Sequence, residues 1–236
     1  MANRTSLIVD VIIPAFNEEG AIGQVVRELP RAYVRDVIVC DNNSTDATAA
    51  RAAAAGAVVV PAPRPGYGSA CLAGHAYIAA REDKRPPDVV AYVDGDGSDY
   101  PAQLPKLLGP LREGLADVVI GSRALGRREP GAMQPHQRFG NWLSTSLISA
   151  FWGVHFTDLG PFRAIRYPTL LALEMSDPDF GWTVEMQVKA AKRRIPVLEV
   201  PVDYRARAHG VSKVSGSLRN SVLAGRKILS TIFVNL

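Results

Sequence analysis

The chain has 236 residues, of which 47% are hydrophobic and 21% are charged. This length and composition fit one globular α/β domain with a substantial core and exclude a mainly disordered chain. The net charge of +4 is compatible with phosphate ligands or an anionic membrane surface. It is too small to indicate a nucleic-acid-binding protein, and no basic stripe with interleaved aromatic residues is present.

Two further sequence features concern the cellular compartment. Cys40 and Cys71 lie in an apolar strand-like run and an alanine-rich helical run, so we expect a buried, reduced pair. No run approaches the roughly 20 apolar residues that span a bilayer. The first residues also lack the hydrophobic segment and cleavage site of a signal peptide. We therefore expect a cytoplasmic protein, soluble or peripheral on the inner face of the membrane.

The first half of the chain alternates apolar strand-like runs with helical runs. The expected strands cover residues 7–14, 34–40, 57–60, 88–93 and 117–122. The expected helices cover residues 18–29, 44–55, 69–81 and 101–115. Ser44 or Thr45 is expected to cap the second of these helices. Such alternation predicts a doubly wound, mostly parallel sheet that binds ligands at the carboxyl ends of its strands.

The second half is less regular. A polar, Gly/Pro-rich stretch at 125–135 is typical of a loop, and a basic, glycine-containing loop is expected at 205–217. Helices are expected over residues 137–152, 183–194 and 218–236, and strands over 162–165 and 197–204. No internal repeat or linker is present, so the sequence predicts one domain over residues 1–236.

Asp94 and Asp96 directly follow the fourth expected strand. Side chains at i and i+2 of an extended chain point the same way, so both carboxylates can lie on one side. Gly95 and Gly97 allow a sharp turn, and Asp99 is expected to be only part of that turn. Carboxylates this close repel each other unless a cation lies between them, and Mg²⁺ commonly combines one or two carboxylates with phosphates. The pattern predicts a metal–diphosphate site, with an acidic turn as the alternative.

Several motifs in a fixed order resemble those of a known enzyme family. They are Pro14-x-x-Asn17-Glu18-Glu19, Asp41-x-x-Ser44-x-Asp46-x-Thr48, Gly66-Tyr67-Gly68-x-Ala70, Asp94-Gly95-Asp96 and Gly121-Ser122-Arg123. This order resembles family 2 glycosyltransferases of the GT-A fold. Asn141 and the segments 158–163 and 199–213 resemble the dolichyl-phosphate mannosyltransferase-like branch, the polyprenyl-phosphate glycosyltransferases.

The resemblance implies an inverting, metal-dependent enzyme that moves a hexose from a UDP- or GDP-sugar to an acceptor, with polyprenyl phosphate as the expected acceptor. It implies a GT-A fold with a Rossmann-like, mostly parallel sheet flanked by helices. Residues 1–123 would form the nucleotide-sugar-binding half, 124–217 the acceptor-side half and 218–236 a C-terminal amphipathic helix. The implied cofactor is Mg²⁺ or Mn²⁺, held by Asp94 and Asp96, the DXD motif.

The family also implies roles for single residues at the donor site. The expected nucleotide-sugar-binding residues are Pro14, Ala15, Asn17, Glu18, Asp41, Arg64, Gly68, Asp94, Gly95 and Arg123. Carboxylates there can accept hydrogen bonds from a base N–H or from ribose hydroxyls. The chain departs from the common Asp-Asp-Gly-Ser-x-Asp-Gly form, because Asn42, Asn43 and Ala47 replace the second Asp and both glycines. Asn43 can adopt the left-handed conformation that a glycine would.

The expected acceptor- or phosphate-binding residues are Arg123, Glu185, Arg205, Arg207 and Lys213, because Arg side chains match phosphate oxygens. Asp96 and Asp158 are the expected catalytic residues. A hydroxyl acceptor needs a base, and Asp158 is the candidate for it. A phosphate acceptor needs none, since its second pKa is near 6, and Asp158 would then orient other groups. A turn or helix cap is the structural alternative for Asp158.

Other functions remain open at this point. A soluble glycosyltransferase that acts on a hydroxyl of a small-molecule or secondary-metabolite acceptor is the main alternative. A sugar-phosphate nucleotidyltransferase is disfavoured, because residues 14–17 read Pro-Ala-Phe-Asn where such enzymes carry a glycine-rich loop with Arg. A non-enzymatic nucleotide-binding module is the third. The final helix, which carries Arg219, Arg226 and Lys227, can lie on a membrane, pack on the domain or form a homodimer.

Overall fold

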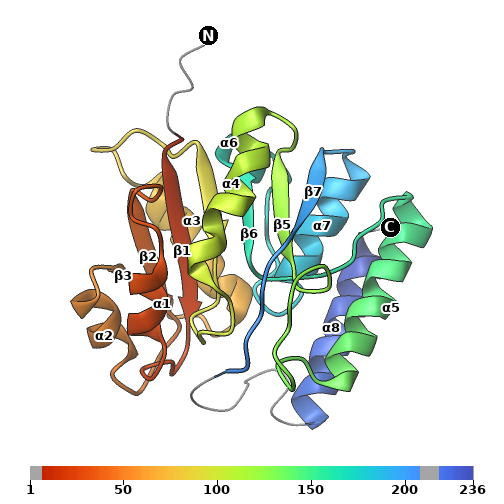
Figure 1. Ribbon diagram of the computed structural model, residues 1–236, viewed down its shortest axis with the longest axis horizontal. Coiled ribbons are helices and arrows are strands. Elements are labelled where there is room, and N and C mark those ends of the chain that lie inside the picture. The colour runs from red at the N-terminus through yellow and green to blue at the C-terminus, as the bar shows by residue number, and fades with distance from the viewer. Residues whose placement is uncertain (1–6, 208–217, 236) are drawn as a thin grey trace.

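A seven-stranded sheet forms the centre of the molecule, in the strand order β3-β2-β1-β4-β6-β5-β7 (Figure 1). The computed structural model describes residues 7–207 and 218–235. The strands are β1 (Val9–Ala15), β2 (Asp36–Asp41), β3 (Val58–Pro61), β4 (Val89–Tyr92), β5 (Val118–Ser122), β6 (Arg163–Arg166) and β7 (Val197–Pro201). The expected strands are therefore present, with small shifts at their ends.

β6 gives the sheet its mixed character. It pairs antiparallel with both β4 and β5, whereas the other pairings of the named strands are parallel. Arg163, at the start of β6, lies opposite Tyr92 near the end of β4 and opposite Ile120 in β5. Because β6 runs in the opposite direction, its beginning lies at the carboxyl ends of its neighbours. The loop at 158–162 is thereby placed beside the strand ends where ligands are expected.

The helices connect and cover the strands. They are α1 (Ile22–Glu28), α2 (Thr48–Ala54), α3 (Tyr67–Ala79), α4 (Leu104–Glu113), α5 (Pro135–Trp152), α6 (Tyr167–Leu173), α7 (Trp182–Lys192) and α8 (Leu218–Val234). A short 3₁₀ turn at Pro101–Gln103 precedes α4. The sequence analysis did not predict α6, which is only seven residues long and carries Pro168 in its first turn. So short a helix has little periodicity to read.

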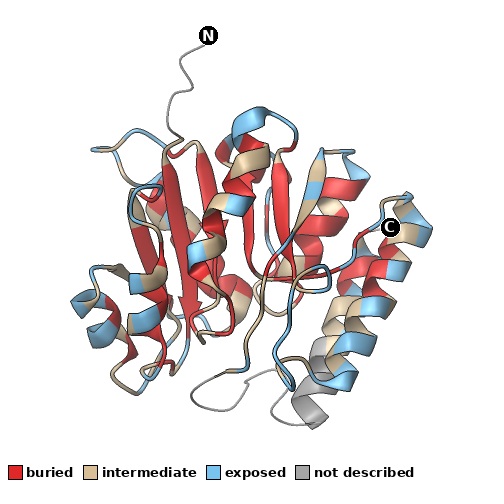
Figure 2. Cartoon of the chain, in the orientation of Figure 1, coloured by how far each residue is buried: buried red, intermediate tan, exposed pale blue. Residues whose placement is uncertain are grey.

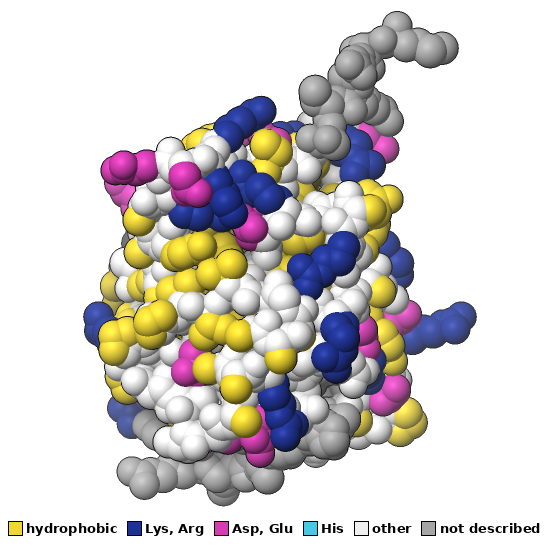
Figure 3. Space-filling model, turned by 90° about the vertical axis from the view of Figure 1, so that its left-hand side faces the viewer, with side chains coloured by type: hydrophobic (Ala, Val, Ile, Leu, Met, Phe, Trp, Pro, Cys, Tyr) yellow, Lys and Arg dark blue, Asp and Glu magenta, His cyan; other side chains and the backbone are white. Residues whose placement is uncertain are grey.

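Two layers of helices enclose the sheet. Apolar residues of α1, α2 and α4 pack on one face, and those of α3, α6 and α7 pack on the other. α5 and α8 contact each other and α7, and so form an outer layer at the far side from β3 (Figure 1). The five inner strands are buried along most of their length, whereas the edge strands β3 and β7 consist of half-buried and exposed residues (Figure 2). On the surface at the β3 edge, hydrophobic side chains gather toward one side, and Lys and Arg side chains lie mainly above and beside them (Figure 3).

The C-terminal helix packs on the domain. Thr231 and Ile232 of α8 are buried, and Lys227 Nζ lies 2.8 Å from Asp177 Oδ2. Of the three possibilities raised by its amphipathic pattern, packing on the domain is confirmed. Among the residues the structure describes, no helix is long and apolar enough to cross a bilayer.

A buried histidine lies in the aromatic cluster beneath the strand ends. His75 Nε2 lies 2.5 Å from the Tyr92 hydroxyl, and its ring lies 6.0 Å from that of Trp182. Burial lowers the pKa of His75 to about 4. Between that value and about 6.5 the unfolded chain binds a proton that the folded chain does not, so stability falls as pH is lowered. We expect the protonation of His75 in the unfolded chain to lower the free energy of unfolding by about 2 kcal/mol from pH 7 to pH 5.

The measurement is urea unfolding of the wild type and His75→Gln at both pH values. The variant should lose less stability on acidification than the wild type. His155→Gln, at an exposed histidine, is the matched control and should follow the wild type. Equal acid sensitivity of wild type and His75→Gln would show that His75 does not carry this effect.

Candidate active site at the carboxyl ends of the strands

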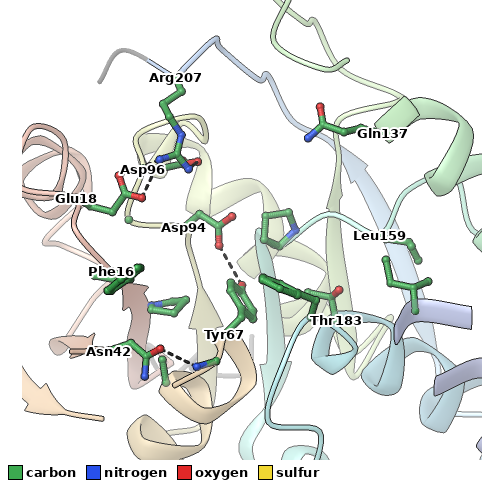
Figure 4. A pocket seen from close by; sticks show the side chains of 18 of the residues that line it. Phe16, Glu18, Asn42, Tyr67, Asp94, Asp96, Gln137, Leu159, Thr183 and Arg207 are labelled. Carbon is green, nitrogen blue, oxygen red and sulfur yellow. Dashed lines mark hydrogen bonds and ion pairs between the residues drawn. The ribbon is translucent and has the colours of Figure 1, made fainter. Parts of the chain in front are cut away.

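A cavity of about 850 Å³ opens where the strands end (Figure 4). One wall is made by residues that end or follow β1, β2, β4 and β5: Pro14, Ala15, Phe16, Glu18, Asn42, Asn43, Asp94, Gly95, Asp96 and Arg123. The opposite wall includes Gln137 and Asn141 of α5 and Ile228 of α8. The structure thus brings together most of the motifs that the sequence places at strand ends.

The paired carboxylates at the end of β4 face this cavity. Asp94 Oδ1 accepts a hydrogen bond from the Tyr67 hydroxyl at 3.0 Å, and Asp96 Oδ1 accepts one from the Ser98 backbone at 2.9 Å. Burial raises the pKa of Asp94 well above its ordinary value, and the negative charges of Asp96 and Asp99 raise it further. Three acidic side chains, of Asp94, Asp96 and Asp99, therefore lie close together here, and a bound cation would relieve the repulsion between their carboxylates.

Asp99 is more than a turn residue. It is 1% exposed, its Oδ1 has no hydrogen-bond partner, and burial followed by the charge of Asp96 raises its pKa to about 7. Its Oδ2 lies 3.4 Å from the Asp94 backbone nitrogen. The expectation that Asp99 belongs only to the turn is wrong, because the sequence did not reveal its burial beneath the DXD motif.

Arg207 bridges the donor-side carboxylates. Its Nη1 lies 2.8 Å from Glu18 Oε1, and its Nη2 lies 2.7 Å from Asp96 Oδ2 (Figure 4). Glu18 and Asp96 precede Arg207 in the chain by 189 and 111 residues. The C-terminal segment therefore supplies a positive charge to the carboxylates of the first half, as its basic composition predicted.

Arg123 and Asp158 form a buried ion pair. Asp158 Oδ2 accepts hydrogen bonds from Arg123 N and Nε, both at 2.8 Å, and Oδ1 accepts one from Nη2 at 2.7 Å. Burial by itself would raise the pKa of Asp158, but the charge and hydrogen bonds of Arg123 outweigh it and lower that pKa. The Arg123 guanidinium also lies 5.0 Å from the ring centre of Tyr204. Asp158 thus holds Arg123 in place at the cavity.

The backbone around Asp158 is itself fixed by buried polar side chains. Arg163, 0% exposed, donates to the carbonyl oxygens of Leu159, Gly160 and Thr183. Gln187 Nε2 donates to the Asp158 carbonyl at 3.0 Å. These contacts hold the loop before β6 in the shape that positions the ion pair.

The end of the cavity near β2 is shaped by asparagines and prolines. Asn42 Nδ2 donates to the carbonyl oxygens of Ala62 and Arg64, and its Oδ1 accepts from Gly66 N at 2.8 Å. Asn43 has φ 64°, so the expected left-handed conformation is confirmed. Asp41 Oδ1 is buried without a hydrogen-bond partner in the described structure, and Asp41 itself does not line the cavity.

Ser44 and Thr45 do not cap α2, so that prediction is wrong. The Ser44 hydroxyl accepts a hydrogen bond from Asn17 N at 2.9 Å, and Thr45 N donates to Asn17 Oδ1 at 2.8 Å. These bonds join the segments that follow β1 and β2. Asn17, with φ 52°, therefore shapes the turn and does not line the cavity itself.

Several expected site residues lie elsewhere. Glu185 is 3% exposed and does not line the cavity; its carboxylate accepts from Ser176 and Asp177 backbone nitrogens and pairs with Lys189. Arg205 pairs with Glu28 at 2.8 Å, away from the lining. Asp41, Arg64 and Gly68 border the lining without belonging to it. Lys213 lies outside the described residues.

Gly68 is required by packing between chain segments. A Cβ at this position would lie 2.0 Å from the Asp177 carbonyl oxygen and 2.8 Å from the Pro178 carbonyl carbon. Both are backbone atoms that cannot move aside as a flexible side chain can. The expected close approach at Gly68 is therefore to another part of this chain.

We expect Gly68→Ala to lower the unfolding free energy by about 3 kcal/mol, because it overpacks a buried backbone contact. Thermal unfolding measures the effect. Gly109→Ala in α4, where a Cβ meets nothing within 4 Å, is the control. It should keep or raise the melting temperature, since alanine favours a helix by up to about 1 kcal/mol over glycine. A melting temperature of Gly68→Ala equal to the wild type would contradict this packing role.

The cavity also contains residues that the sequence analysis did not assign. Tyr67, which belongs to the recognised Gly-Tyr-Gly motif, contacts Asp94, and Tyr204 lies against Arg123. Met133, Leu159, Phe180 and other apolar residues form much of the lining. Their positions depend on contacts between distant segments. In the sequence, Tyr67 lies in the Gly-Tyr-Gly motif, and Leu159 and Tyr204 lie in the segments 158–163 and 199–213 that resemble the family branch.

The carboxylates of Asp94 and Asp96 fit a divalent cation. Both provide the hard oxygen ligands that Mg²⁺ and Mn²⁺ prefer, and they adjoin excess negative charge. Among the described residues, no group of three or more His, Cys, Asp or Glu side chains is arranged to hold a metal. A cation here would therefore complete its coordination with ligand phosphates and water.

The fold matches solved glycosyltransferase structures. A crystal structure of a mycobacterial protein aligns with a TM-score of 0.77 at 27% identity, over 98% of this chain and 75% of that one. Glucosyl-3-phosphoglycerate synthase from Mycobacterium tuberculosis, solved with Mn²⁺, uridine diphosphate and phosphoglyceric acid, aligns with a TM-score of 0.76 at 24% identity, over 98% and 79%. The second likeness concerns the fold alone. Together with the mixed seven-stranded sheet, these matches show a GT-A fold.

The chain belongs to glycosyltransferase family 2, whose family model, Glycosyl transferase family 2, matches residues 10–170. An uncharacterized glycosyltransferase of Mycobacterium tuberculosis is 40% identical over 217 residues, which cover 92% of this chain and 94% of that protein. The undecaprenyl-phosphate mannosyltransferase of Micrococcus luteus is 32% identical, over 88% and 87%. The polyprenol monophosphomannose synthase of Mycolicibacterium smegmatis is 30% identical, over 88% and 81%. The resemblance to the polyprenyl-phosphate branch is thus confirmed.

Proposed function

We propose that this glycosyltransferase moves a hexose from a UDP- or GDP-sugar to polyprenyl phosphate, with inversion at the anomeric carbon and with Mg²⁺ or Mn²⁺ as cofactor. The observation that carries the proposal is a single cavity that joins a charged end to an apolar wall. The charged end holds Glu18, Asp94, Asp96, Arg123 and Arg207. Such a cavity suits a ligand pair with phosphates in the middle and a hydrocarbon chain at one side.

The donor would lie along the ends of β1, β2 and β4. Pro14, Ala15 and Phe16 line the cavity there, together with Asn42 and Asn43, which directly follow Asp41. Asp94 and Asp96 would hold the metal ion against the diphosphate. When bound, the cation supplies Lewis-acid neutralisation of the charge that develops on the leaving nucleoside diphosphate.

The reaction needs one bond to form and one to break. A phosphate oxygen of the acceptor attacks the anomeric carbon from the side opposite the diphosphate. The bond between that carbon and the diphosphate oxygen breaks, and the nucleoside diphosphate leaves with the electron pair. No proton has to be removed from a phosphate that is already ionised at neutral pH.

The ion pair of Asp158 favours a phosphate acceptor over a hydroxyl acceptor. Its carboxylate accepts three hydrogen bonds from Arg123, and its pKa is lowered, so it is a poor base near neutral pH. Arg123 lines the cavity, and its guanidinium could bind an acceptor phosphate there. Asp158 would then act as a positioning residue.

The apolar wall favours a hydrocarbon chain on the acceptor. Met133, Leu159, Pro161, Phe180 and Ile228 line the cavity between the loop before β6, α5 and α8. A small polar acceptor would leave this surface without a partner, whereas isoprene units would be removed from water against it. The names of the polyprenyl-phosphate relatives support the same acceptor class.

The test supplies UDP-glucose, UDP-N-acetylglucosamine and GDP-mannose in turn with Mn²⁺, with and without a short polyprenyl phosphate, and follows nucleotide release and lipid-linked sugar. We expect one donor to react only when the lipid phosphate is present. Release independent of lipid phosphate, with transfer to an added alcohol, would instead identify a glycosyltransferase for hydroxyl acceptors. Pyrophosphate as the product would identify a nucleotidyltransferase.

A further inference from the structure

α5 presents two large aromatic side chains outward. Phe139 and Trp142 are each 60% exposed, and their ring centres lie 5.8 Å apart. On the same helix Gln137 and Asn141 line the cavity, and Ile148 is fully buried. The helix therefore has an outward aromatic face and an inward face that forms part of the cavity wall.

The surroundings of this face are basic. Neither α5 nor α8 contains Asp or Glu, and no acidic residue follows Asp203 in the chain. Arg127, Arg128 and Arg138, just before and within α5, are exposed. The one acidic residue among positions 125–152 is Glu129, which accepts hydrogen bonds from the Tyr100 hydroxyl and the Ala206 backbone.

We propose that the surface formed by Phe139, Trp142 and Arg138 of α5, here called the α5 face and preceded in the chain by the exposed Arg127 and Arg128, docks on an anionic lipid bilayer. Exposed aromatic rings are stabilised at the level of lipid headgroups, and basic side chains are attracted to anionic lipids. A single amphipathic face of this size gives reversible, salt-sensitive attachment.

Charge complementarity favours a bilayer over a second copy of this chain. A two-fold interface through the α5 face would place the same basic residues of two copies near each other, which is unfavourable. An anionic headgroup layer offers the opposite charge over the whole face.

The location of the α5 face next to the cavity relates membrane docking to the binding of the lipid acceptor. This relation rests on the proposed function. Arg128 Nη1 lies 3.8 Å from the sulfur of Met133, a cavity-lining residue. α5 thus lies between the bilayer-facing surface and the cavity, with one side of the helix toward each. A polyprenyl phosphate could then pass from the membrane into the cavity beside α5 with little exposure of its chain to water.

The test is sedimentation with vesicles of phosphatidylcholine alone or mixed with phosphatidylglycerol. We expect the full chain to bind only the mixed vesicles and to be released by high salt. Phe139→Ser/Trp142→Ser should lower the partition coefficient by at least about tenfold. The control Leu115→Ser/Leu171→Ser alters two leucines that are 59% and 57% exposed, away from α5, and should bind as the wild type does.

Two outcomes would overturn the proposal. One is a wild type that does not bind the mixed vesicles, or an aromatic double variant that binds them equally well. The other is a dimer by light scattering that this double variant converts to a monomer, which would identify the α5 face as a subunit interface. Turnover of a short, water-soluble isoprenyl phosphate without vesicles tests the proposed function separately from membrane docking. It should be unchanged in the double variant, because neither aromatic ring lines the cavity.

Discussion

Asp96→Asn is expected to lower the turnover of the nucleotide sugar by at least about a thousandfold, because Lewis-acid stabilisation by a metal is worth several kcal/mol. The change keeps the size of the side chain and removes one of the two carboxylates of the DXD motif, both of which line the cavity. It also removes the carboxylate partner that lies 2.7 Å from Arg207. The measurement is kcat as a function of Mn²⁺ concentration, together with Mn²⁺ binding in the presence of the nucleoside diphosphate.

Asp117→Asn is the matched control for this change. Asp117 pairs with Arg166 at 3.1 Å on the surface, just before β5 and thus at the opposite end of the sheet from the cavity. We expect its kcat and metal dependence to equal those of the wild type. Metal-dependent turnover that survives Asp96→Asn unchanged would show that the metal is held elsewhere.

Asp158→Asn is expected to lower the unfolding free energy by about 3–5 kcal/mol, because it leaves the buried Arg123 charge without its partner. In a chain of this length the melting temperature should fall by roughly 10 °C. The lowered pKa of Asp158 means that its stabilisation is present above the unfolded value of about 3.9 and is lost as pH falls through the folded pKa. The wild type should therefore lose more stability than the variant on acidification below about pH 4.

A double variant separates stability from function at this ion pair. Arg123→Met/Asp158→Leu removes both charges, so we expect it to recover much of the stability that Asp158→Asn loses. It should still raise KM for the phosphate acceptor, because the guanidinium at the cavity is gone. A different result would identify Asp158 as a base: normal stability of Asp158→Asn, with a low kcat and loss of the acidic limb of the pH profile.

The electrostatics of the cavity suggest why Arg207 contacts Asp96 in this structure. Asp94, Asp96 and Asp99 lie close together, and the charges of the last two raise the pKa of Asp94. Arg207 supplies a positive charge to this group and to Glu18.

Local sequence patterns were enough to predict the strands, most of the helices and the gathering of several motifs at the carboxyl ends of the strands. Strand and helix periodicity depends on neighbouring residues, and parallel strands place their carboxyl ends at one edge of a sheet. The motifs at Pro14, Asp94 and Arg123 could therefore be assigned to one cavity from the order of strands and helices alone. The fold class followed from the alternation of strands and helices together with the order of those motifs.

Long-range packing settled the remaining features, because they depend on contacts between distant parts of the chain. The antiparallel direction of β6 brings Asp158 to Arg123, 35 residues away, where the two side chains form a buried ion pair. Burial of Glu185 under the chain at Ser176 removes it from the cavity. Neither can be read from periodicity or spacing, because both require knowing which segments the folded chain places side by side.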